Sequence, residues 1–226
     1  MLANKNPVIE MLEYHVNPST RSTVDWLNLE KGEDFAVWEA AREIREKALI
    51  HSELYLGMRR ISVQRFQLSW FNGQSINIHG KGRGGGKWRT IAPHKDTAEL
   101  FATVKEHNSQ LAKKAGSDSY PDNMMLCVKG TNLRKYGFTS LDNIVKRVSV
   151  RSGIEFSHHT LRRTAGRRMW KAGIAIESIA RFLGHSDIRM TMLYIGANYD
   201  DTEAAMRAAE KWDEERKRSA NGTGGP

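Results

Sequence analysis

The spacing of apolar residues along the chain predicts a mainly helical protein. Apolar side chains that recur every three or four positions share one face of a helix. Residues 34–56 follow this pattern at Phe35, Trp38, Ala41, Ile44, Ala48 and Leu49, and residues 94–114 follow it at Leu100, Phe101, Val104 and Leu111. One long helix is therefore expected over each of these two segments.

Glycines divide the second half of the chain into shorter predicted helices. A helix that Thr139 or Ser140 caps is expected to stop at Gly153, because glycine adopts the left-handed backbone that ends many helices. Gly173 and Gly184 are expected to end helices in the same way. The further helices predicted in this half cover residues 160–172, 175–183, 187–195 and 201–218.

A glycine-rich hairpin is predicted between two short strands. Residues 74–79 and 87–92 have strand character, and the segment GKGRGGG joins them. The segment matches the G-x-G-x-x-G pattern at Gly80, Gly82 and Gly85, but a strand follows it where a dinucleotide-binding fold has a helix. We therefore reject a nucleotide site and interpret the hairpin as a basic finger that lies on nucleic acid.

Together these elements predict one main domain of mainly α structure with a small antiparallel β-sheet, an α+β fold. Residues 124–128 form a buried run that fits either a strand or a helix. The main domain is expected over residues 34–200, because 226 residues suffice for one good core. Residues 1–33 are interpreted as a lead-in or linker remnant, and residues 201–226 as a C-terminal helix with a disordered tail.

Composition indicates a cytoplasmic protein without a membrane span or a metal. No apolar run approaches the roughly 20 residues that cross a bilayer, and the N-terminus lacks the features of a secretory signal. The single Cys127 excludes an internal disulfide and a cysteine-rich zinc site. His79 and His94 lie in no arrangement of carboxylates or cysteines that suggests metal binding.

A net charge of +9 and a pI near 9.7 point to a polyanionic partner. Charge alone does not separate DNA from RNA or an acidic membrane surface. The basic residues form two blocks, and the region before the first block is rich in glutamate. The blocks contain Arg59, Arg60, Arg65, Lys81, Arg83, Lys87, Arg89 and Lys95, and then Lys146, Arg147, Arg151, Arg162, Arg163, Arg167, Arg168 and Lys171. Two such blocks predict a groove that grips a phosphate backbone from two sides.

The chain offers the groups that metal-independent cleavage of a phosphodiester requires. Tyr194 is the candidate nucleophile, and its ordinary pKa of about 10 must be lowered by a cationic surround. Arg59 and Arg162 suit the non-bridging oxygens, because guanidinium groups match them in bidentate geometry. Tyr136 and Tyr199 are weaker candidates for the nucleophile, because neither has the same nine-residue spacing from a histidine that Tyr194 has.

Three further side chains complete the candidate active site. His159 lies three residues before Arg162 on one predicted helical face, where it can accept the proton of the nucleophile or bond the phosphate. His185 is expected to donate to a non-bridging oxygen. Lys81 on the hairpin is expected to protonate the leaving 5′ oxygen, with Lys87 as a rival. Additional DNA contacts are expected from Arg60, Arg83, Lys87, Arg89 and Arg163.

These motifs, in this order, resemble those of the tyrosine recombinases, the family of phage integrases and Xer and Cre proteins. The resemblance covers roughly residues 35–200 and rests on Gly57-Met58-Arg59, Gly80-Lys81-Gly82, His159-Thr160-Leu161-Arg162, Leu183-Gly184-His185-Ser186-Asp187 and Tyr194. It implies a helical catalytic domain, a covalent 3′-phosphotyrosine intermediate and no metal or nucleotide cofactor. It also implies double-stranded DNA at a specific recombination site as the partner, with a homotetramer on DNA and a monomer free of it.

The sequence departs from the family pattern in two places. Ser62 stands where the family has an acidic residue three positions after Arg59, and residues 1–33 are too few for the N-terminal DNA-clamping domain of relatives. The chain is then either a catalytic fragment or a minimal enzyme, and we favour a fragment of a host-cytoplasmic, nucleoid-associated recombinase that integrates or excises a mobile or viral element. The alternatives are an enzyme like a type IB topoisomerase and a DNA-binding module without catalytic activity.

Overall fold

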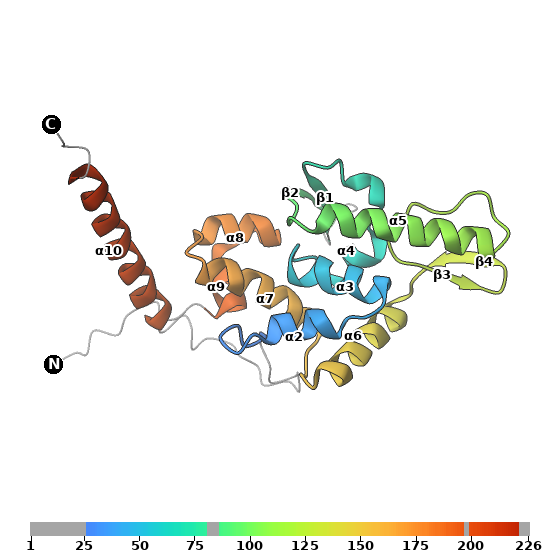
Figure 1. The fold of residues 1–226 in the computed structure, drawn as a ribbon, viewed down its shortest axis with the longest axis horizontal. Helices are drawn as coiled ribbons and strands as arrows, with labels where there is room; N and C mark the ends of the chain where they lie inside the picture. The colour runs from blue at the N-terminus through green and yellow to red at the C-terminus, as the bar shows by residue number, and fades with distance from the viewer. Residues whose placement is uncertain (1–25, 81–85, 197–198, 222–226) are drawn as a thin grey trace.

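Helices dominate the structure, a computed structural model that describes residues 26–80, 86–196 and 199–221 (Figure 1). The helices are α2 Glu33–Ala40, α3 Ile44–Leu54, α4 Arg60–Arg65, α5 Thr97–Lys114, α6 Phe138–Ser152, α7 His158–Lys171, α8 Ile176–Leu183, α9 Ile188–Ile195 and α10 Tyr199–Asn221, with a short 3-10 helix η1 at Leu68–Trp70. Two small antiparallel sheets accompany them. The predicted fold class, mainly α with small antiparallel sheets, is confirmed.

Each sheet is a two-stranded hairpin. β1 Ile76–His79 pairs with β2 Trp88–Ile91, so the predicted strands on either side of the glycine-rich segment are confirmed. β3 Leu126–Lys129 pairs with β4 Asn132–Lys135, so the ambiguous apolar run contributes a strand. The strand β4 was not predicted, because the segment Asn-Leu-Arg-Lys has little strand character of its own and pairs with β3.

The single long helix expected over residues 34–56 is wrong. The backbone becomes extended at Ala41, and α3 begins after a capping box in which the side chains of Glu43 and Glu46 bond the backbone of each other's residue. A capping box satisfies the free amides of a new first turn, so it starts a second helix inside the apolar pattern. Phe35, expected in the buried stripe, is 62% exposed on the first of the two helices.

The helix that carries two candidate active-site residues begins earlier than predicted. Ser157 caps α7, accepting a bond from the Thr160 amide, while the Thr160 hydroxyl accepts one from the Ser157 amide. This reciprocal pair fixes the first turn of α7. His159 and Arg162 therefore both lie on α7, as their spacing predicts.

The main core lies around α3, which packs against α2, α5, α6 and α7. A second, smaller apolar cluster of Ile179, Leu183 and Ile195 joins α8 and α9 to α7. Leu27 is buried in the main core and its amide donates to Thr164, so the packed part of the chain begins before residue 34.

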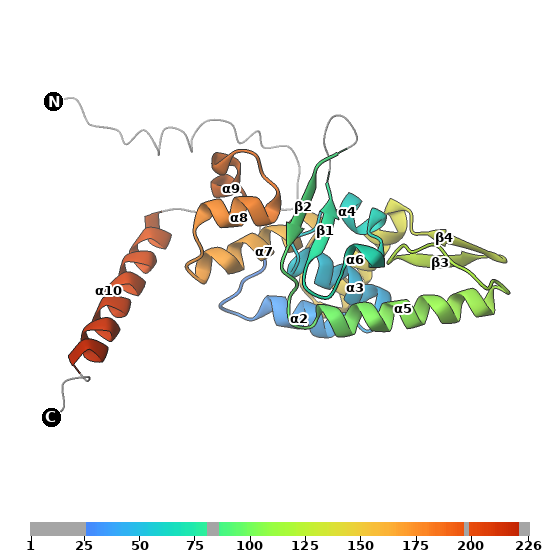
Figure 2. The same cartoon turned by 90° about the horizontal axis from the view of Figure 1, so that it is seen from above.

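The C-terminal helix α10 stands apart from the helices of the main core in both ribbon views (Figures 1 and 2). Figure 2 also shows the β1–β2 hairpin beside α8, and the two elements are in contact. None of the described helices is long and apolar enough to cross a membrane.

Candidate active site

The turn between α3 and α4 brings three segments of the chain together at Gly57. Gly57 has a φ of 57°, and a Cβ atom there would lie 2.7 Å from the ring of Phe182 on α8. Only glycine fits this left-handed position and this close approach. The Gly57 carbonyl accepts hydrogen bonds from the guanidinium groups of Arg162 and Arg89, so it joins α7 and β2 to the turn.

Arg59 directly follows this turn and caps α4 through its backbone. Its half-buried side chain lines the central cleft, and burial lowers the pKa of its guanidinium. The Ser62 hydroxyl, at the position where an acidic residue was expected, donates to the His79 carbonyl at 2.9 Å. Ser62 therefore ties α4 to the hairpin and provides no counter-charge for Arg59.

Arg162 is the most constrained cation of the site. It is 2% exposed and donates to the carbonyls of Gly57 and Leu183, which lie at the turn before α4 and the end of α8. Burial, with the neighbouring charge of Arg59, lowers its pKa to about 10. Carbonyl acceptors orient this guanidinium without neutralising it, so its charge remains available to an anion.

His185 follows Gly184, the glycine that ends α8, as predicted. Its Nε2 lies 3.4 Å from a guanidinium nitrogen of Arg162, and its Nδ1 lies 3.0 Å from the Thr191 hydroxyl. Because a guanidinium has no acceptor, Nε2 must accept here, and Nδ1 carries the proton. Burial and the charge of Arg162 lower the pKa of His185 to about 4. His185 is thus neutral near pH 7, and donating to a phosphate requires the other tautomer.

Tyr194 lies on α9 with its ring edge-on to His185, the centroids 5.1 Å apart. The guanidinium carbons of Arg162 and Arg163 lie 5.8 Å and 5.2 Å from the centroid of the tyrosine ring. The Tyr194 hydroxyl is buried and makes no hydrogen bond to the part of the chain that the structure describes. The expected lowering of its pKa is wrong, because burial raises the pKa more than Arg162, Arg163 and Arg59 lower it.

These side chains line one cleft of about 640 Å³. The described residues that line it are Arg59, Gly80, Lys87, Trp88, Arg89, His159, Arg162, Gly184, His185, Ser186, Met190 and Tyr194. Four of them carry a positive charge and none is a carboxylate. The cleft therefore has the electrostatic character of an anion site.

Arg89 contributes an unexpected part of this charge. It was predicted as a DNA contact on the hairpin, and the structure places it in the cleft beside Gly184. Burial, together with Arg162 and Arg59, lowers its pKa to about 9. Its Nε is buried without a hydrogen-bond partner in the described part of the chain. The cation thus has an unused donor.

The other predicted site residues are divided between the cleft and its surroundings. Lys87 and the exposed His159 line the cleft. Arg60 lies outside it and pairs with Asp142 at 2.6 Å. Lys81 and Arg83 lie outside the described residues.

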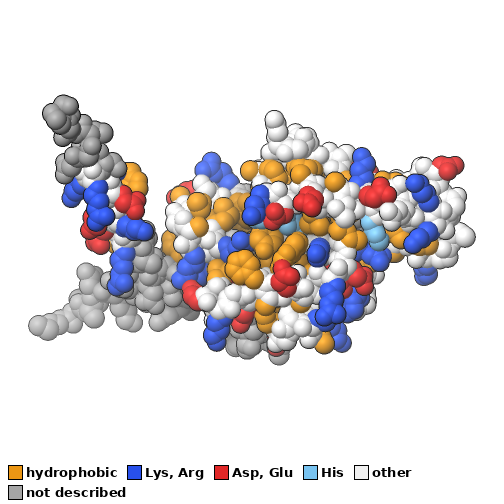
Figure 3. Space-filling model, viewed as in Figure 1, with side chains coloured by type: hydrophobic (Ala, Val, Ile, Leu, Met, Phe, Trp, Pro, Cys, Tyr) orange, Lys and Arg blue, Asp and Glu red, His pale blue; other side chains and the backbone are white. Residues whose placement is uncertain are grey.

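Much of the second basic block is neutralised by the glutamate-rich region before the first block. Arg147 and Arg151 pair with the buried Glu46, and Arg168 pairs with Asp34. On the face drawn in Figure 3, basic side chains are interspersed with acidic ones. The cleft, and not this face, is where cations gather without acidic partners. In residues 26–80, 86–196 and 199–221 no group of three or more His, Cys, Asp or Glu is arranged to hold a metal ion.

Comparisons with known proteins agree with this geometry. The chain is 25% identical to the tyrosine recombinase XerC of Roseiflexus sp. (strain RS-1) over 167 residues, which are 73% of this chain and 51% of XerC. The chain thus spans about half the length of this curated relative. Its structure is similar to that of the XerA recombinase, with a TM-score of 0.63 and 19% identity over 88% of this chain and 67% of XerA.

A second structural relative is the XerH site-specific recombinase bound to its palindromic difH substrate in a post-cleavage complex. The TM-score is 0.63, with 18% identity over 85% of this chain and 54% of XerH. The model of the phage integrase family matches residues 33–201, which contain every described residue that lines the cleft. The chain therefore belongs to the phage integrase family.

Proposed function

We propose that this chain is a site-specific DNA recombinase that cleaves and rejoins DNA through a covalent 3′-phosphotyrosine intermediate. The observation that carries the proposal is the cleft in which four cationic side chains and no carboxylate surround one phenol. A phosphodiester is the anion that this arrangement fits, because its two non-bridging oxygens match guanidinium donors. Integration or excision of a mobile or viral element is the biological role that we infer.

In the proposed reaction the guanidinium groups bind the phosphate and hold it in line with Tyr194. Arg59 and Arg162 bond the non-bridging oxygens, and the unused donor of Arg89 adds a third contact. The negative charge that develops on these oxygens in the transition state strengthens all of these bonds. The negative phosphate also offsets the burial and mutual repulsion that lower the pKa values of Arg89 and Arg162.

Cleavage exchanges one phosphate ester for another. The Tyr194 oxygen forms a bond to phosphorus while the bond to the 5′ oxygen breaks. Because burial raises the pKa of Tyr194, little tyrosinate forms in advance, and the proton must leave during the attack. His159 is the base that we propose for this proton. Lys81 or Lys87 gives a proton to the departing 5′ oxygen, and rejoining reverses each step.

The choice between the two lysines can be tested with a 5′-thio leaving group, which departs without a proton. Substituting the lysine that acts as the acid lowers cleavage of the oxygen substrate, and the thio substrate restores the rate. Lys87 lines the cleft, whereas Lys81 belongs to a segment outside the described residues. Rescue of Lys87→Ala alone would assign the acid to Lys87, and rescue of Lys81→Ala alone would assign it to Lys81.

We further propose that the partner is double-stranded DNA with a specific site, bound by a homotetramer that forms from free monomers on the nucleoid of the host. Binding of XerH to difH supports a DNA partner. The exposed Met206 and Trp212, 63% and 55% accessible on α10, support a contact with a neighbouring subunit. Light scattering with and without DNA, on the wild type and on Trp212→Ala, tests this assembly.

The chemistry itself is tested with a nicked DNA substrate that traps the covalent intermediate. The wild type is expected to form an adduct on a specific site and Tyr194→Phe none. An adduct that persists in Tyr194→Phe would overturn the assignment of the nucleophile. Relaxation of random plasmids would identify an enzyme like a type IB topoisomerase, and specific binding without any nicking would identify an inactive binding module.

A further inference from the structure

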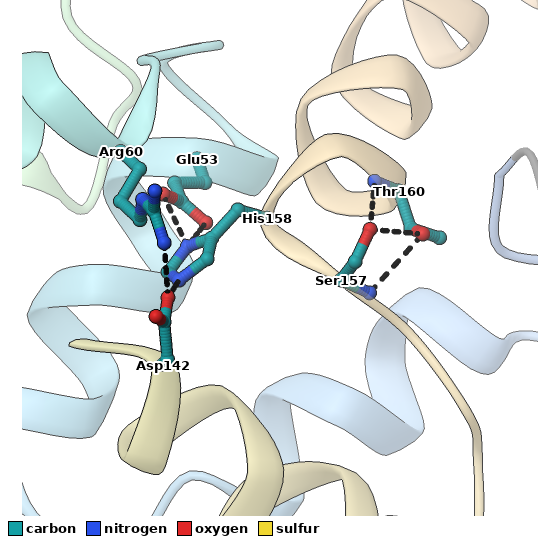
Figure 4. Close-up of polar contacts among 6 residues, drawn as sticks. All are labelled: Glu53, Arg60, Asp142, Ser157, His158 and Thr160. Atoms are coloured by element: carbon teal, nitrogen blue, oxygen red, sulfur yellow. Dashed lines mark hydrogen bonds and ion pairs between the residues drawn. The ribbon is translucent and has the colours of Figure 1, made fainter. Parts of the chain in front are cut away.

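A chain of four charged side chains joins α3, α4, α6 and α7 (Figure 4). Glu53 of α3 is completely buried, and its two carboxylate oxygens lie 2.8 Å and 2.9 Å from Nδ1 of His158. The other ring nitrogen of His158 lies 3.0 Å from Asp142 Oδ1 on α6. Arg60 of α4 donates to the same Oδ1 at 2.6 Å. We call these four residues the Glu53 network.

The network holds the immediate neighbours of two cleft residues. Arg60 follows Arg59, and His158 precedes His159, in the sequence. Both neighbours bond one oxygen of Asp142, so the first turns of α4 and α7 are anchored to a common point. No member of the network lines the cleft itself. These residues can therefore affect the chemistry through the placement of Arg59 and His159, while the charge of Glu53 also acts on Arg162.

All hydrogen bonds of the Glu53 network form only while His158 and Glu53 share one proton in addition to the proton of a neutral imidazole. Both nitrogens of His158 face carboxylate oxygens, so each position needs a hydrogen between the two atoms. This condition is met by an imidazolium next to ionised Glu53, or by a neutral imidazole next to protonated Glu53. Loss of the proton leaves the lone pair of Nδ1 against a buried carboxylate, which is repulsive.

We propose that the Glu53 network is a protonation-dependent positioning device that sets Arg59 and His159 for DNA strand cleavage. The inference rests on the function proposed above. The charged groups that surround His158 are Glu53 from α3, Asp142 from α6 and, through Asp142, Arg60 from α4. Ser62 does not provide a carboxylate beside Arg59, whereas the carboxylate of Glu53 acts on His158, Arg162 and Arg60.

The direction of the pH effect follows from the two carboxylates. Both raise the pKa of His158 above its ordinary value, against the opposing effect of burial, and burial raises the pKa of Glu53. The network is therefore intact below the elevated pKa of His158 and is lost as the pH rises through it. Removing either carboxylate charge moves this loss to lower pH.

The test is the pH profile of single-turnover cleavage of the nicked DNA, measured with DNA affinity on folded variants. His158→Gln is expected to lower the cleavage rate by about 10-fold to 10²-fold with affinity little changed, because a misplacement of reacting groups by up to about 1 Å has effects up to this size. Asp142→Asn, at the half-exposed end, is expected to move the alkaline fall of the rate to lower pH. Glu53→Gln should do the same, and Glu53→Gln/His158→Gln should be no slower than His158→Gln alone.

His107→Gln is the matched control, since His107 lies on α5 outside the network and the cleft lining. It should keep the wild-type rate and pH profile. If Glu53→Gln does not fold, the inference is still tested by Asp142→Asn, in which the alkaline fall of the cleavage rate should move to lower pH. Suppose that the wild type forms the adduct, and that His158→Gln cleaves at the same rate and with the same pH profile as His107→Gln. This result would overturn the network inference and leave the proposed function standing. Absence of any wild-type adduct would instead overturn the proposed function, and the inference with it.

Discussion

Two clusters of charged side chains lie next to each other on α3, α4 and α7, and they are balanced in opposite ways. In the Glu53 network two carboxylates face an arginine and a histidine, so positive and negative groups match within the protein. In the cleft four cations stand with no carboxylate among the described lining residues. The difference indicates that the charges of the Glu53 network are balanced within the folded protein, whereas the charges of the cleft are balanced by a bound anion.

The repulsion among the cations of the cleft destabilises the protein when no anion is bound. Burial and mutual repulsion lower the pKa of Arg162 to about 10 and that of Arg89 to about 9. A lowered pKa of a cation means that the fold disfavours its charge. A bound phosphate offsets this cost, so the site is less stable empty than occupied.

The largest expected effect is that of removing the buried cation of the cleft. Arg162→Ala should lower single-turnover cleavage by at least about 10², because its charge acts on the developing oxyanion. DNA affinity should change much less. Arg181→Ala, which removes an exposed charge from α8, is the control and should cleave normally. Equal losses of cleavage and affinity in Arg162→Ala would show that Arg162 only grips the DNA backbone.

A smaller effect, on stability, is expected from removing an anion of the Glu53 network. Glu53→Gln should lower the free energy of unfolding by about 2 kcal/mol, the range for a buried hydrogen bond to a charged group. Urea denaturation measures this change. Glu99→Gln, on the exposed face of α5, should lie within about 0.5 kcal/mol of the wild type. An equally stable Glu53→Gln would mean that the network is not balanced as described.

Removing a cation from the cleft should raise the free energy of unfolding, the opposite of the effect expected for Glu53→Gln. Arg89→Met keeps much of the side-chain volume and relieves repulsion, so it should stabilise the free protein by about 1 kcal/mol, which is roughly 3 °C in Tm for a chain of this size. Inorganic phosphate should raise the Tm of the wild type more than that of Arg89→Met. A lower Tm for Arg89→Met, with an unchanged response to phosphate, would contradict a cationic anion site.

The smallest expected effects are the contributions of His185 and His158 to the pH dependence of stability, and the two contributions are lost in opposite directions of pH. His185 in the cleft has a pKa of about 4, so its contribution to stability is lost as the pH falls from 6.5 through 4. The pKa of His158 is raised, so its contribution is lost as the pH rises above its elevated value. NMR titration of the imidazole signals measures both. Titration of both histidines on the same side of 6.5 would remove the contrast.

The sequence predicted the cleft best where local spacing decides geometry. His159 and Arg162 lie three positions apart and share a helix, and the strands on either side of the glycine-rich segment pair with each other. Gly184 ends α8 and leads directly to His185, as expected. Each of these features depends on residues that are close together in the sequence.

The features that the sequence did not predict depend on packing between distant segments. The second basic block was interpreted as one wall of a groove, yet Glu46 and Asp34 neutralise part of it from over a hundred residues away. Arg89 reaches the cleft because β2 packs beside α8. The sequence around His158 does not show that Glu53 and Asp142 converge on this side chain.

The decisive measurement is to identify the residue that carries the DNA after cleavage. The adduct with nicked DNA is digested with nuclease and protease, and mass spectrometry locates the remaining nucleotide. A 3′-phosphate linked to Tyr194 is the expected result, since its hydroxyl is the phenol at the cationic cleft. A nucleotide on any other residue, such as Tyr136 or Tyr199, would contradict it.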